Sequence, residues 1–330
     1  MGGTPEAGGS ALFLWLDWLE NVVNLESTGA LEGLRRLELG DLPAYKAALN
    51  QTNRTCWQQY FPFLYFYYVL DGSDELLISE VRGTICIFRL SRKSGQPQLC
   101  LYFLPMPMDE RVLQECLERV RVFNSSKGAL IYWVDEKDIG LLGNLGASVR
   151  ANPLEREYLY DPRVYRSLSG KKTRELRKNL DRVRDRNNVE VRAFGEADVE
   201  DCLALMDEWA LIQQDKYERI AYQRYTRNCI KLHAHFSKQD LSGKVVLVEG
   251  KIRSFGFAGE IRAGLANLFI TYSDHNIKGL NKFLIYNMML DMQGYSLINS
   301  AKADTPGLRY AKESLFPVAM HGMYRAYVIQ

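Results

Sequence analysis

The sequence lacks an apolar run long enough to cross a membrane, since a spanning helix needs about 18 consecutive apolar residues. The best candidates, residues 11–16 and 61–70, are much shorter. The first ten residues are rich in glycine and have no basic stretch, so they do not resemble a secretory signal peptide. We therefore expect a cytoplasmic protein without a membrane span, in which residues 1–10 form a flexible tail.

Patterns typical of metal sites and disulfides are absent as well. The 6 cysteines form no Cys-x-x-Cys pair, and none has a histidine at zinc-finger spacing. His233 and His235 are two residues apart, so on a helix they point to different faces, which is poor spacing for a metal. His275 and His321 are isolated, with no evident partner for a catalytic triad. We expect no metal, and buried free thiols in place of disulfides.

Neither sign of charge dominates the chain as a whole. Lys and Arg number 42 and Asp and Glu number 40, which gives a net charge of +2 and argues against a generally basic surface that binds nucleic acid. The basic residues are nevertheless concentrated in residues 166–186, which hold nine basic and three acidic side chains, while all other residues hold 33 and 37. One segment therefore carries a net charge of +6 against −4 for the rest.

This basic segment has the pattern of an amphipathic helix. Leu176, Leu180 and Val183 recur at helical spacing and are expected to face the core. The helix is expected to start near residues 169–171, where free backbone N–H groups attract anions. We predict that it binds phosphate, of tRNA or of an anionic lipid headgroup, and the alternative is a solvated basic face. The predicted phosphate-binding side chains are Lys171, Lys172, Arg174, Arg177, Lys178 and Arg182.

Helix and strand patterns occur in the same order in both parts of the chain, after a first amphipathic helix at residues 11–24. Before residue 160, strands are expected at residues 36–39, 61–70, 76–80, 85–90, 98–103 and 129–134, and helices at 41–51, from 109 to beyond 120, and 139–142. After residue 189, strands are expected at residues 189–192, 245–249, 253–261, 266–272, 297–299 and 324–329, and helices at 196–214, 222–235, 279–293 and 306–314.

The shared order predicts an internal structural duplication. It indicates an α/β (α+β) fold in which each half is a mixed sheet flanked by helices. We expect an N-terminal domain at residues 11–160, a basic linker helix at 161–188 and a C-terminal domain at 189–330. Ligands of such sheets bind where neighbouring strands diverge.

A dense polar cluster follows the strand expected at residues 297–299. Thr305 and Pro306 have the pattern of a helix N-cap and first turn. Arg309 and Lys312 lie three residues apart and so share a face of that helix. Two cations facing a cleft can hold a phosphate or an oxyanion. The alternative is a capped helix with ordinary surface charges.

Several motifs, taken together and in order, resemble those of one family. They are Tyr158-Leu-Tyr-Asp161, Leu168-Ser-Gly-Lys-Lys172, Arg177-Lys178 and Asn299…Asp304…Gly307-Leu-Arg309…Lys312…Pro317. The set resembles the C-terminal domain family of phosphatidylglycerol lysyltransferases, which also has soluble stand-alone members, and the resemblance covers about residues 36–330. It implies two tandem domains similar to Gcn5-related N-acetyltransferases, joined by a basic helix.

The resemblance also implies an activity. The best-known members of the family transfer an amino acid from aminoacyl-tRNA to a lipid hydroxyl, and related peptidoglycan-bridge enzymes use the same double fold and donor. We therefore expect an aminoacyltransferase whose acceptor is a lipid, a peptide or a small molecule. No DNA partner is expected.

For such a transfer we assign roles to the residues of the C-terminal cluster. Arg309 and Lys312 are expected to stabilise the donor phosphate or the developing oxyanion. Asp304 and Glu260 are candidates for holding the amino group or for acting as general base, and the alternative for Glu260 is a salt bridge at a strand end. The expected substrate-binding residues are Tyr272, Asn299, Lys302 and Gly307. Within that set Asn299 is expected to order the loop, and Tyr272 either donates a hydrogen bond to the leaving group or packs in the core.

No cofactor is expected, because aminoacyl-tRNA is the donor substrate. An acetyl-CoA enzyme would carry a Gln/Arg-x-x-Gly-x-Gly/Ala loop, and the matching residues 276–281 keep Gly279 but have Asn276 and Asn281 at the first and last positions. A side chain at the last position hinders close approach of the backbone to a pyrophosphate, which makes acetyl-CoA the weaker candidate. Two alternatives stay open: a CoA-dependent N-acyltransferase, and a catalytically silent module that binds a phosphorylated ligand or a protein.

Overall fold

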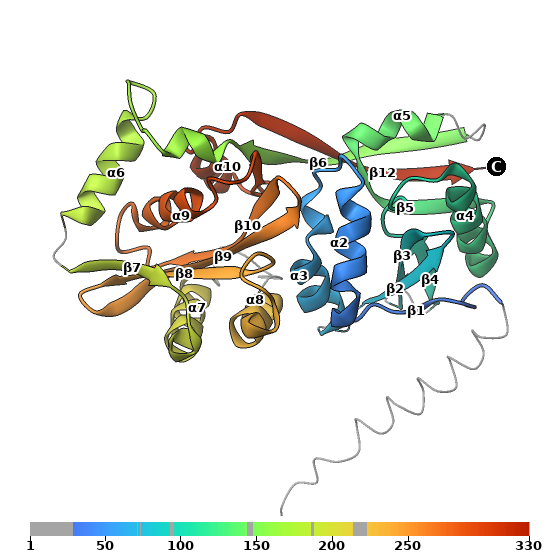
Figure 1. Ribbon diagram of the computed structural model, residues 1–330, viewed down its shortest axis with the longest axis horizontal. Helices are drawn as coiled ribbons and strands as arrows, with labels where there is room; N and C mark the ends of the chain where they lie inside the picture. Colours follow the sequence, from blue (N-terminus) through green and yellow to red (C-terminus); the bar gives the residue numbers. More distant parts are fainter. Residues whose placement is uncertain are drawn as a thin grey trace, which may run out of the picture.

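The computed structural model describes residues 29–70, 72, 74–92, 96–143, 148–185, 188–213 and 223–329. The tail expected at residues 1–10 and the helix expected at residues 11–24 lie outside these residues. The described strands form one sheet of 12 strands in the order β1-β2-β3-β4-β5-β12-β6-β11-β10-β9-β8-β7. Figure 1 shows this sheet running along the length of the molecule, with helices on both of its faces.

The first half consists of a strand, a helix, an antiparallel meander, and two strands that each follow a further helix. Its strands are β1 (Arg35–Arg36), β2 (Asp74–Val81), β3 (Thr84–Ser91), β4 (Gln98–Leu101), β5 (Gly128–Asp135) and β6 (Ser148–Tyr160). Its helices are α2 (Leu42–Asn50), α3 (Phe61–Leu64), the π-helix η3 (Tyr65–Val69), α4 (Glu110–Asn124) and α5 (Ile139–Leu142).

The second half repeats this plan after the basic helix α6 (Arg174–Arg184). Its strands are β7 (Val189–Ala193), β8 (Ser242–Val248), β9 (Lys251–Arg262), β10 (Leu265–Ser273), β11 (Leu297–Asn299) and β12 (Ala319–Ile329). Its helices are α7 (Val199–Gln213), α8 (Gln223–Leu232), α9 (Leu280–Asp291) and α10 (Pro306–Glu313). In each half the third meander strand pairs in parallel with the strand that follows the long helix, as β4 does with β5 and β10 with β11.

The same ion-pair motif opens both halves. Arg35 donates to both carboxylate oxygens of Asp41, which also accepts a hydrogen bond of 2.8 Å from the backbone N–H of Glu38. Arg192 likewise donates to both oxygens of Asp198, each at 2.7 Å, and Asp198 accepts from the backbone three residues earlier at 2.8 Å. In each case the aspartate ends a 3₁₀ turn that leads into the next helix. The two halves therefore start with the same local structure.

The last strand of each half lies in the sheet of the other half. β6 ends the first half in sequence, but its end pairs with β11, where Leu159 lies opposite Asn299. β12 ends the second half, but from Met323 to Ile329 it pairs with β5. β6 and β12 also pair with each other, in antiparallel fashion, along the length of β12. We call these four strands (β5, β12, β6 and β11) the seam, and they interlock the two halves.

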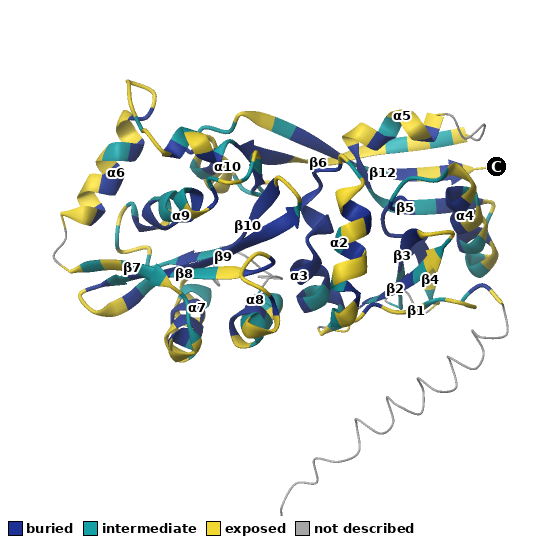
Figure 2. Ribbon diagram, viewed as in Figure 1, coloured by how far each residue is buried: buried dark blue, intermediate teal, exposed yellow. Residues whose placement is uncertain are grey.

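Three apolar cores hold the helices to the sheet. The first contains residues from both halves, such as Ile78 of β2 and Phe257 of β9, together with side chains of α2, α3, α7 and α8. The second packs α6 and α9 on the second half, and the third packs α4 on the first half. Figure 2 shows the central strands as buried and the outer faces of the helices as exposed. The halves thus share a core as well as strands.

Most of the expected elements are present, and all 6 cysteines are buried and free as expected. The strand expected at residues 61–70 is wrong, because this segment forms α3 and η3, with Pro62 in the first helical turn. A continuous apolar run fits a helix that is buried all round as well as a strand. The sequence pattern also does not predict β6, whose first nine residues are mostly exposed. The basic helix begins at Arg174, later than expected.

A largely buried ion cluster joins α2 to the second half. Lys46 Nζ lies 2.5 Å from Asp240 Oδ1 and 3.0 Å from Glu260 Oε1, and the three side chains are 17%, 12% and 8% exposed. Gln239 donates to the other carboxylate oxygen of Glu260 at 2.9 Å. Both carboxylates are therefore withdrawn from water and depend on Lys46 for compensation of their charge.

Replacing Lys46 by Met should lower the free energy of unfolding by about 3–5 kcal/mol, because the change leaves charges buried without a partner. Adding Glu260→Gln to this variant should recover part of the loss. Urea unfolding followed by circular dichroism measures both effects. The exposed Lys127→Met is the control, expected to change stability by less than about 0.5 kcal/mol. A Lys46→Met variant as stable as this control would contradict the cluster's role.

Candidate functional site

β10 and β11 run side by side for three residues and then separate. Their last paired residues are Asn267 and Asn299, after which β10 continues to Ser273 paired with β9 alone among the described strands. Ligands of open mixed sheets bind where neighbouring strands diverge. The divergence lies beside the seam, and the chain that leaves β11 there carries the polar C-terminal motif.

Asn299 organises a buried polar network at this point. Its side chain is fully buried, and its Nδ2 donates to the carbonyl of Thr55 and to Glu157 Oε2, both at 2.6 Å. Its Oδ1 accepts from the backbone N–H of Ala301 at 2.8 Å. Asn299 therefore connects β11 to β6 and to a loop of the first half, and it orders the loop that follows β11.

Glu157 of β6 is the carboxyl group at the centre of this network. It is fully buried and accepts hydrogen bonds from the backbone N–H of Trp57, at 3.1 Å, and from Asn299. Burial raises the pKa of Glu157 to about 8, although these donors act in the opposite direction. Glu157 is therefore protonated over much of the neutral range.

His321 of β12 completes the network. Its Nε2 lies 3.1 Å from Asp135 Oδ2, and its Nδ1 lies 3.1 Å from Glu136 Oε1. Burial lowers the pKa of His321, but the ion pair with Asp135 more than offsets it, so that this pKa is raised overall. The expectation that His321 is isolated is wrong, because its partners lie on β5 and the following turn, 185 residues away in sequence for Glu136. We call Asp135, Glu157, Asn299 and His321 the seam network.

Lys312 of α10 lies under the loop that leaves β11. Its Nζ donates to the carbonyls of Ser300 and Ala301, the latter at 3.1 Å, and lies 5.7 Å from the centre of the Tyr158 ring. Ala301 has a φ of 55°, a strained left-handed conformation of a kind that clusters at functional sites. Burial lowers the pKa of Lys312 to about 8. Lys312 thus holds a strained loop beside the strand divergence.

Lys302 and Asp304 lie on the open side of the same loop. Lys302 Nζ is 2.9 Å from Glu155 Oε2 and 3.0 Å from Asp304 Oδ1. The side chains of Lys302 and Asp304 are 45% and 66% exposed, whereas that of Glu155 is 7% exposed. A substrate can therefore reach this ion pair from solvent.

The other residues expected at the site have different surroundings. Glu260 belongs to the ion cluster with Lys46. The ring of Tyr272 is buried and stacks on Phe255 with 5.2 Å between the ring centres. Gly307 and Arg309 are exposed residues of α10. The structure thus brings together Lys312, Asn299, Lys302 and Asp304, and places Glu260 and Tyr272 in other surroundings. Arg309 lies exposed on the helix that carries Lys312.

The basic residues of α6 lie at the end of the molecule that is away from the first half (Figure 1). Leu176, Leu180 and Val183 are buried as expected. Arg177 donates to the carbonyl of Leu168 at 3.0 Å and to Thr173 Oγ1 at 2.6 Å, so it holds the start of the helix. The remaining predicted phosphate-binding residues are exposed: Lys171, Lys172, Arg174, Lys178 and Arg182.

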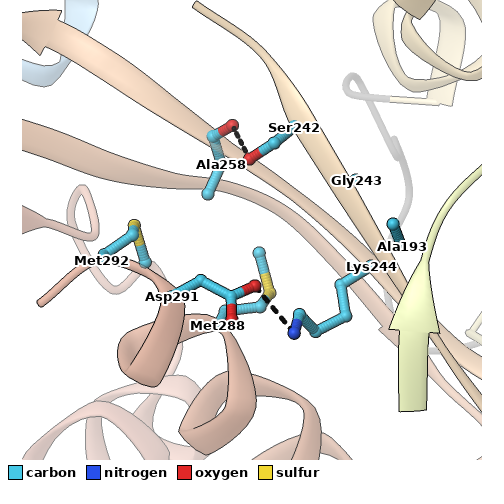
Figure 3. A pocket seen from close by; sticks show the side chains of 8 residues that line it. All are labelled: Ala193, Ser242, Gly243, Lys244, Ala258, Met288, Asp291 and Met292. Carbon is cyan, nitrogen blue, oxygen red and sulfur yellow. Dashed lines mark hydrogen bonds and ion pairs between the residues drawn. The ribbon is translucent and has the colours of Figure 1, made fainter. Parts of the chain in front are cut away.

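Two recesses in the surface lie away from this site. The smaller, of about 130 Å³, lies between β8 and α9, and the ion pair of Lys244 with Asp291, at 2.7 Å, crosses it (Figure 3). It has room for about four water molecules, which is too little for an aminoacyl nucleoside. The larger, of about 410 Å³, lies beside Arg35 and Asp41 in the first half. Neither is lined by the seam network.

The sequence analysis does not predict Asp135, Glu155, Glu157 or His321 as site residues. Of these, Glu155 and Glu157 are the pair that lies close together in sequence. They lie two apart on one strand, so their side chains point to the same face. The signal available in the sequence was the spacing of these two glutamates, directly before the motif that starts at Tyr158.

In the part of the chain that the structure describes, no helix is long and apolar enough to cross a membrane, and no group of side chains is suited to hold a metal ion.

Comparison with known proteins places this geometry in context. The family described as phosphatidylglycerol lysyltransferase, C-terminal, matches residues 61–327. No curated protein matches the chain. A conserved protein of unknown function from Bacteroides thetaiotaomicron VPI-5482 is 19% identical, with a TM-score of 0.77, and the match covers 90% of this chain and 99% of that one.

Two further solved structures share the fold. L-PGS from Bacillus licheniformis is 18% identical, with a TM-score of 0.59 and coverage of 86% of this chain and 91% of that one. FemX is 8% identical, with a TM-score of 0.60 and coverage of 88% and 96%. The fold is that of two tandem Gcn5-related N-acetyltransferase-like domains, as expected.

The seam network predicts how stability depends on pH. Unfolded Glu157 loses its proton near pH 4.5, whereas the folded protein keeps it up to about pH 8, so stability should fall as pH rises between these values. The raised pKa of His321 acts in the same direction, because the stability it contributes at low pH is lost as pH rises through that pKa. Glu157→Gln removes the first contribution and should flatten the profile by at most about 1.4 kcal/mol per pH unit.

Urea unfolding between pH 5 and 8.5 measures this difference. Glu200→Gln is the control, since that side chain is exposed at the start of α7. If the Glu157→Gln profile is as steep as that of the unchanged protein, the buried carboxyl does not titrate as described.

Proposed function

Because the chain belongs to the family of phosphatidylglycerol lysyltransferase C-terminal domains, we propose that it transfers an amino acid from aminoacyl-tRNA to a hydroxyl or amine acceptor. The observation that carries the proposal is the strained loop held by Lys312 where β10 and β11 diverge. The donor is an activated ester, so the enzyme needs only to position the reactants and stabilise the charge that develops.

Lys312 is a cation that contacts the loop at the strand divergence. An ammonium group has three donors, and two of those of Lys312 are used by Ser300 and Ala301. The third is available for the oxyanion that forms when the acceptor attacks the ester. Because Asn299 fixes the backbone of Ala301, we assign it a positioning role that acts through this loop.

Asp304 is suited to hold the donor's α-amino group. Its carboxylate is exposed beside Lys302 at the edge of the loop, and a carboxylate binds an ammonium group through charge-assisted hydrogen bonds. Lys302 is itself held by Glu155 on β6.

The exposed cations of α6 are suited to bind the tRNA backbone, whose phosphates account for most of the affinity in such complexes. α6 is also a neighbour of α10. The hydroxyl of Tyr310 lies 3.5 Å from Glu175 Oε1, and Lys172 Nζ lies 5.7 Å from the centre of the Phe316 ring, just after α10. A tRNA bound along α6 therefore lies beside the helix that carries Lys312.

A CoA donor fits the helix starts of both halves poorly. In the second half, a Cβ on Gly279 would lie 3.0 Å from the carbonyl oxygen of Asn179, because α6 packs on the turn before α9. In the first half, the Asp109 carboxylate caps α4 by accepting from the N–H of Val112 at 3.0 Å. It places negative charge where a pyrophosphate would bind. These features favour tRNA over CoA, and the strained loop favours an enzyme over a silent binding module.

Incubation with labelled aminoacyl-tRNAs and, in parallel, with acyl-CoAs tests the proposal. The protein should accelerate loss of label from at least one aminoacyl-tRNA and leave the acyl-CoAs unchanged. Lys312→Met should slow that reaction about 100-fold, the typical effect of removing one oxyanion donor. Lys127→Met, which loses an exposed lysine, should react like the unchanged protein. Failure to deacylate any aminoacyl-tRNA would contradict the proposal.

The role of the basic segment at the start of α6 is tested by salt dependence. The double variant Lys171→Ala with Lys172→Ala should weaken tRNA binding and lower the slope of log affinity against log salt by about 2, if both side chains meet phosphates. A control with the same loss of charge is Lys127→Ala with Lys238→Ala, two exposed lysines outside α6. An equal slope in the two double variants would show that Lys171 and Lys172, in the turn that leads into α6, do not contact phosphates.

A further inference from the structure

Two arginines of the first-half sheet stack on one tyrosine. The guanidinium carbon of Arg89 lies 4.3 Å from the centre of the Tyr132 ring, and that of Arg325 lies 4.2 Å from it. Arg89 comes from β3 and Arg325 from β12, on opposite sides of β5, which carries Tyr132. β4 lies between the strands that carry Arg89 and Tyr132, and its residue opposite Arg89 is Cys100. The small side chain of Cys100 leaves room for Arg89 to extend over β4 to the ring.

The two arginines differ in what neutralises them. Arg89 donates to Asp74 Oδ2 from Nε at 3.1 Å and from Nη2 at 2.7 Å. Arg325 has no carboxylate or hydrogen-bond acceptor among the described residues, and only its Nε is closed off from water without a partner. Its two terminal nitrogens therefore face the surface with their donors unused. The contact with Tyr132 offsets only part of the unfavourable free energy of withdrawing a charge from water.

The backbone explains why Arg325 is aimed at this point. The register between β12 and β5 shifts between Tyr324 and Ala326, so that Tyr132 and Trp133 together lie opposite Arg325. Such bulges bend a strand and redirect side chains, and they are common beside functional sites. The stacked ring then holds the planar guanidinium in one orientation, which prepares its terminal N–H groups for two parallel hydrogen bonds.

Arg325 lies on the same face of the sheet as the seam network. Side chains alternate along a strand, and Arg325 follows His321 by four residues on β12. At the usual rise per residue, the two are about 13 Å apart along the strand. Arg325 and His321 thus share one face of the sheet.

We propose that Arg325, stacked on Tyr132 and backed by Arg89, binds the phosphate or carboxylate group of a small molecule. The charge of Arg89 is compensated by Asp74, and burial raises the pKa of Cys100 to about 11, so that its thiol is neutral. One positive charge is therefore left for the ligand. If the proposed function holds, on which this sentence rests, the anion belongs to the acceptor.

Titration of the full chain with inorganic phosphate, and separately with acetate, tests this site at constant ionic strength set with chloride. Tryptophan fluorescence and the thermal midpoint report binding. The unchanged protein should respond saturably to at least one of the two anions, and Arg325→Gln should weaken that affinity at least tenfold. Arg325→Lys keeps the charge but loses the planar fork, so it should weaken binding as well. Arg163→Gln is the control, because that exposed arginine already pairs with Asp161.

The thermal midpoint without anion gives a second readout. Arg325→Gln removes an uncompensated charge and should melt no lower than the unchanged protein. Absence of saturable binding by the unchanged protein, or equal affinity in Arg325→Gln, would overturn the site. Deacylation of aminoacyl-tRNA, measured on the same samples, separates the two proposals. Anion binding without deacylation would refute the proposed function alone, and deacylation without anion binding would refute the anion site alone.

Discussion

The exchange of β6 and β12 between the halves is the constraint on which the rest of the structure depends. Without its partner, each half would end at an unpaired strand, at β5 in the first half and at β11 in the second, with open hydrogen-bonding groups. The exchange closes both edges at once. It also brings Glu157 of the first half next to His321 of the second, since these residues lie opposite each other on β6 and β12. The polar network therefore exists only when both halves are in place.

The candidate active site depends on the same exchange of strands. Asn299 lies on β11 of the second half, but its hydrogen-bond partners Thr55 and Glu157 come from the first half. Lys312 and the strained Ala301 are then fixed by Asn299 from one side and by the backbone of Tyr158 on β6 from the other. The hydrogen bonds of Asn299 hold its own side chain and the backbone of Ala301 in place, which is what catalysis by positioning requires. The geometry of the loop after β11 therefore depends on contacts from both halves of the molecule.

The sequence was sufficient to predict the elements but not how they are exchanged. The spacing of hydrophobic residues and the positions of turn residues predict nearly every helix and strand, because these signals act over a few residues. The motif around Lys312 was also recognisable, since its residues lie close together in sequence. The network around Glu157 was not, because Thr55, Glu157 and Asn299 are separated by about 100 residues or more along the chain and meet only through the exchange. The ion pair of Glu260 with Lys46 and the stacking of Arg325 on Tyr132 depend on tertiary structure in the same way.

Native-state hydrogen exchange of amides that donate to side chains at the seam and beside it tests the central claim most directly. The backbone N–H groups of Trp57, Ala301 and Gly322 donate to Glu157, Asn299 and Glu136, respectively. If the halves form one interlocked unit, these amides should exchange only by global unfolding and with the same free energy, as should core amides of β3 and β9. Two separate free energies for the two halves, or faster exchange at the seam than in either core, would contradict the account.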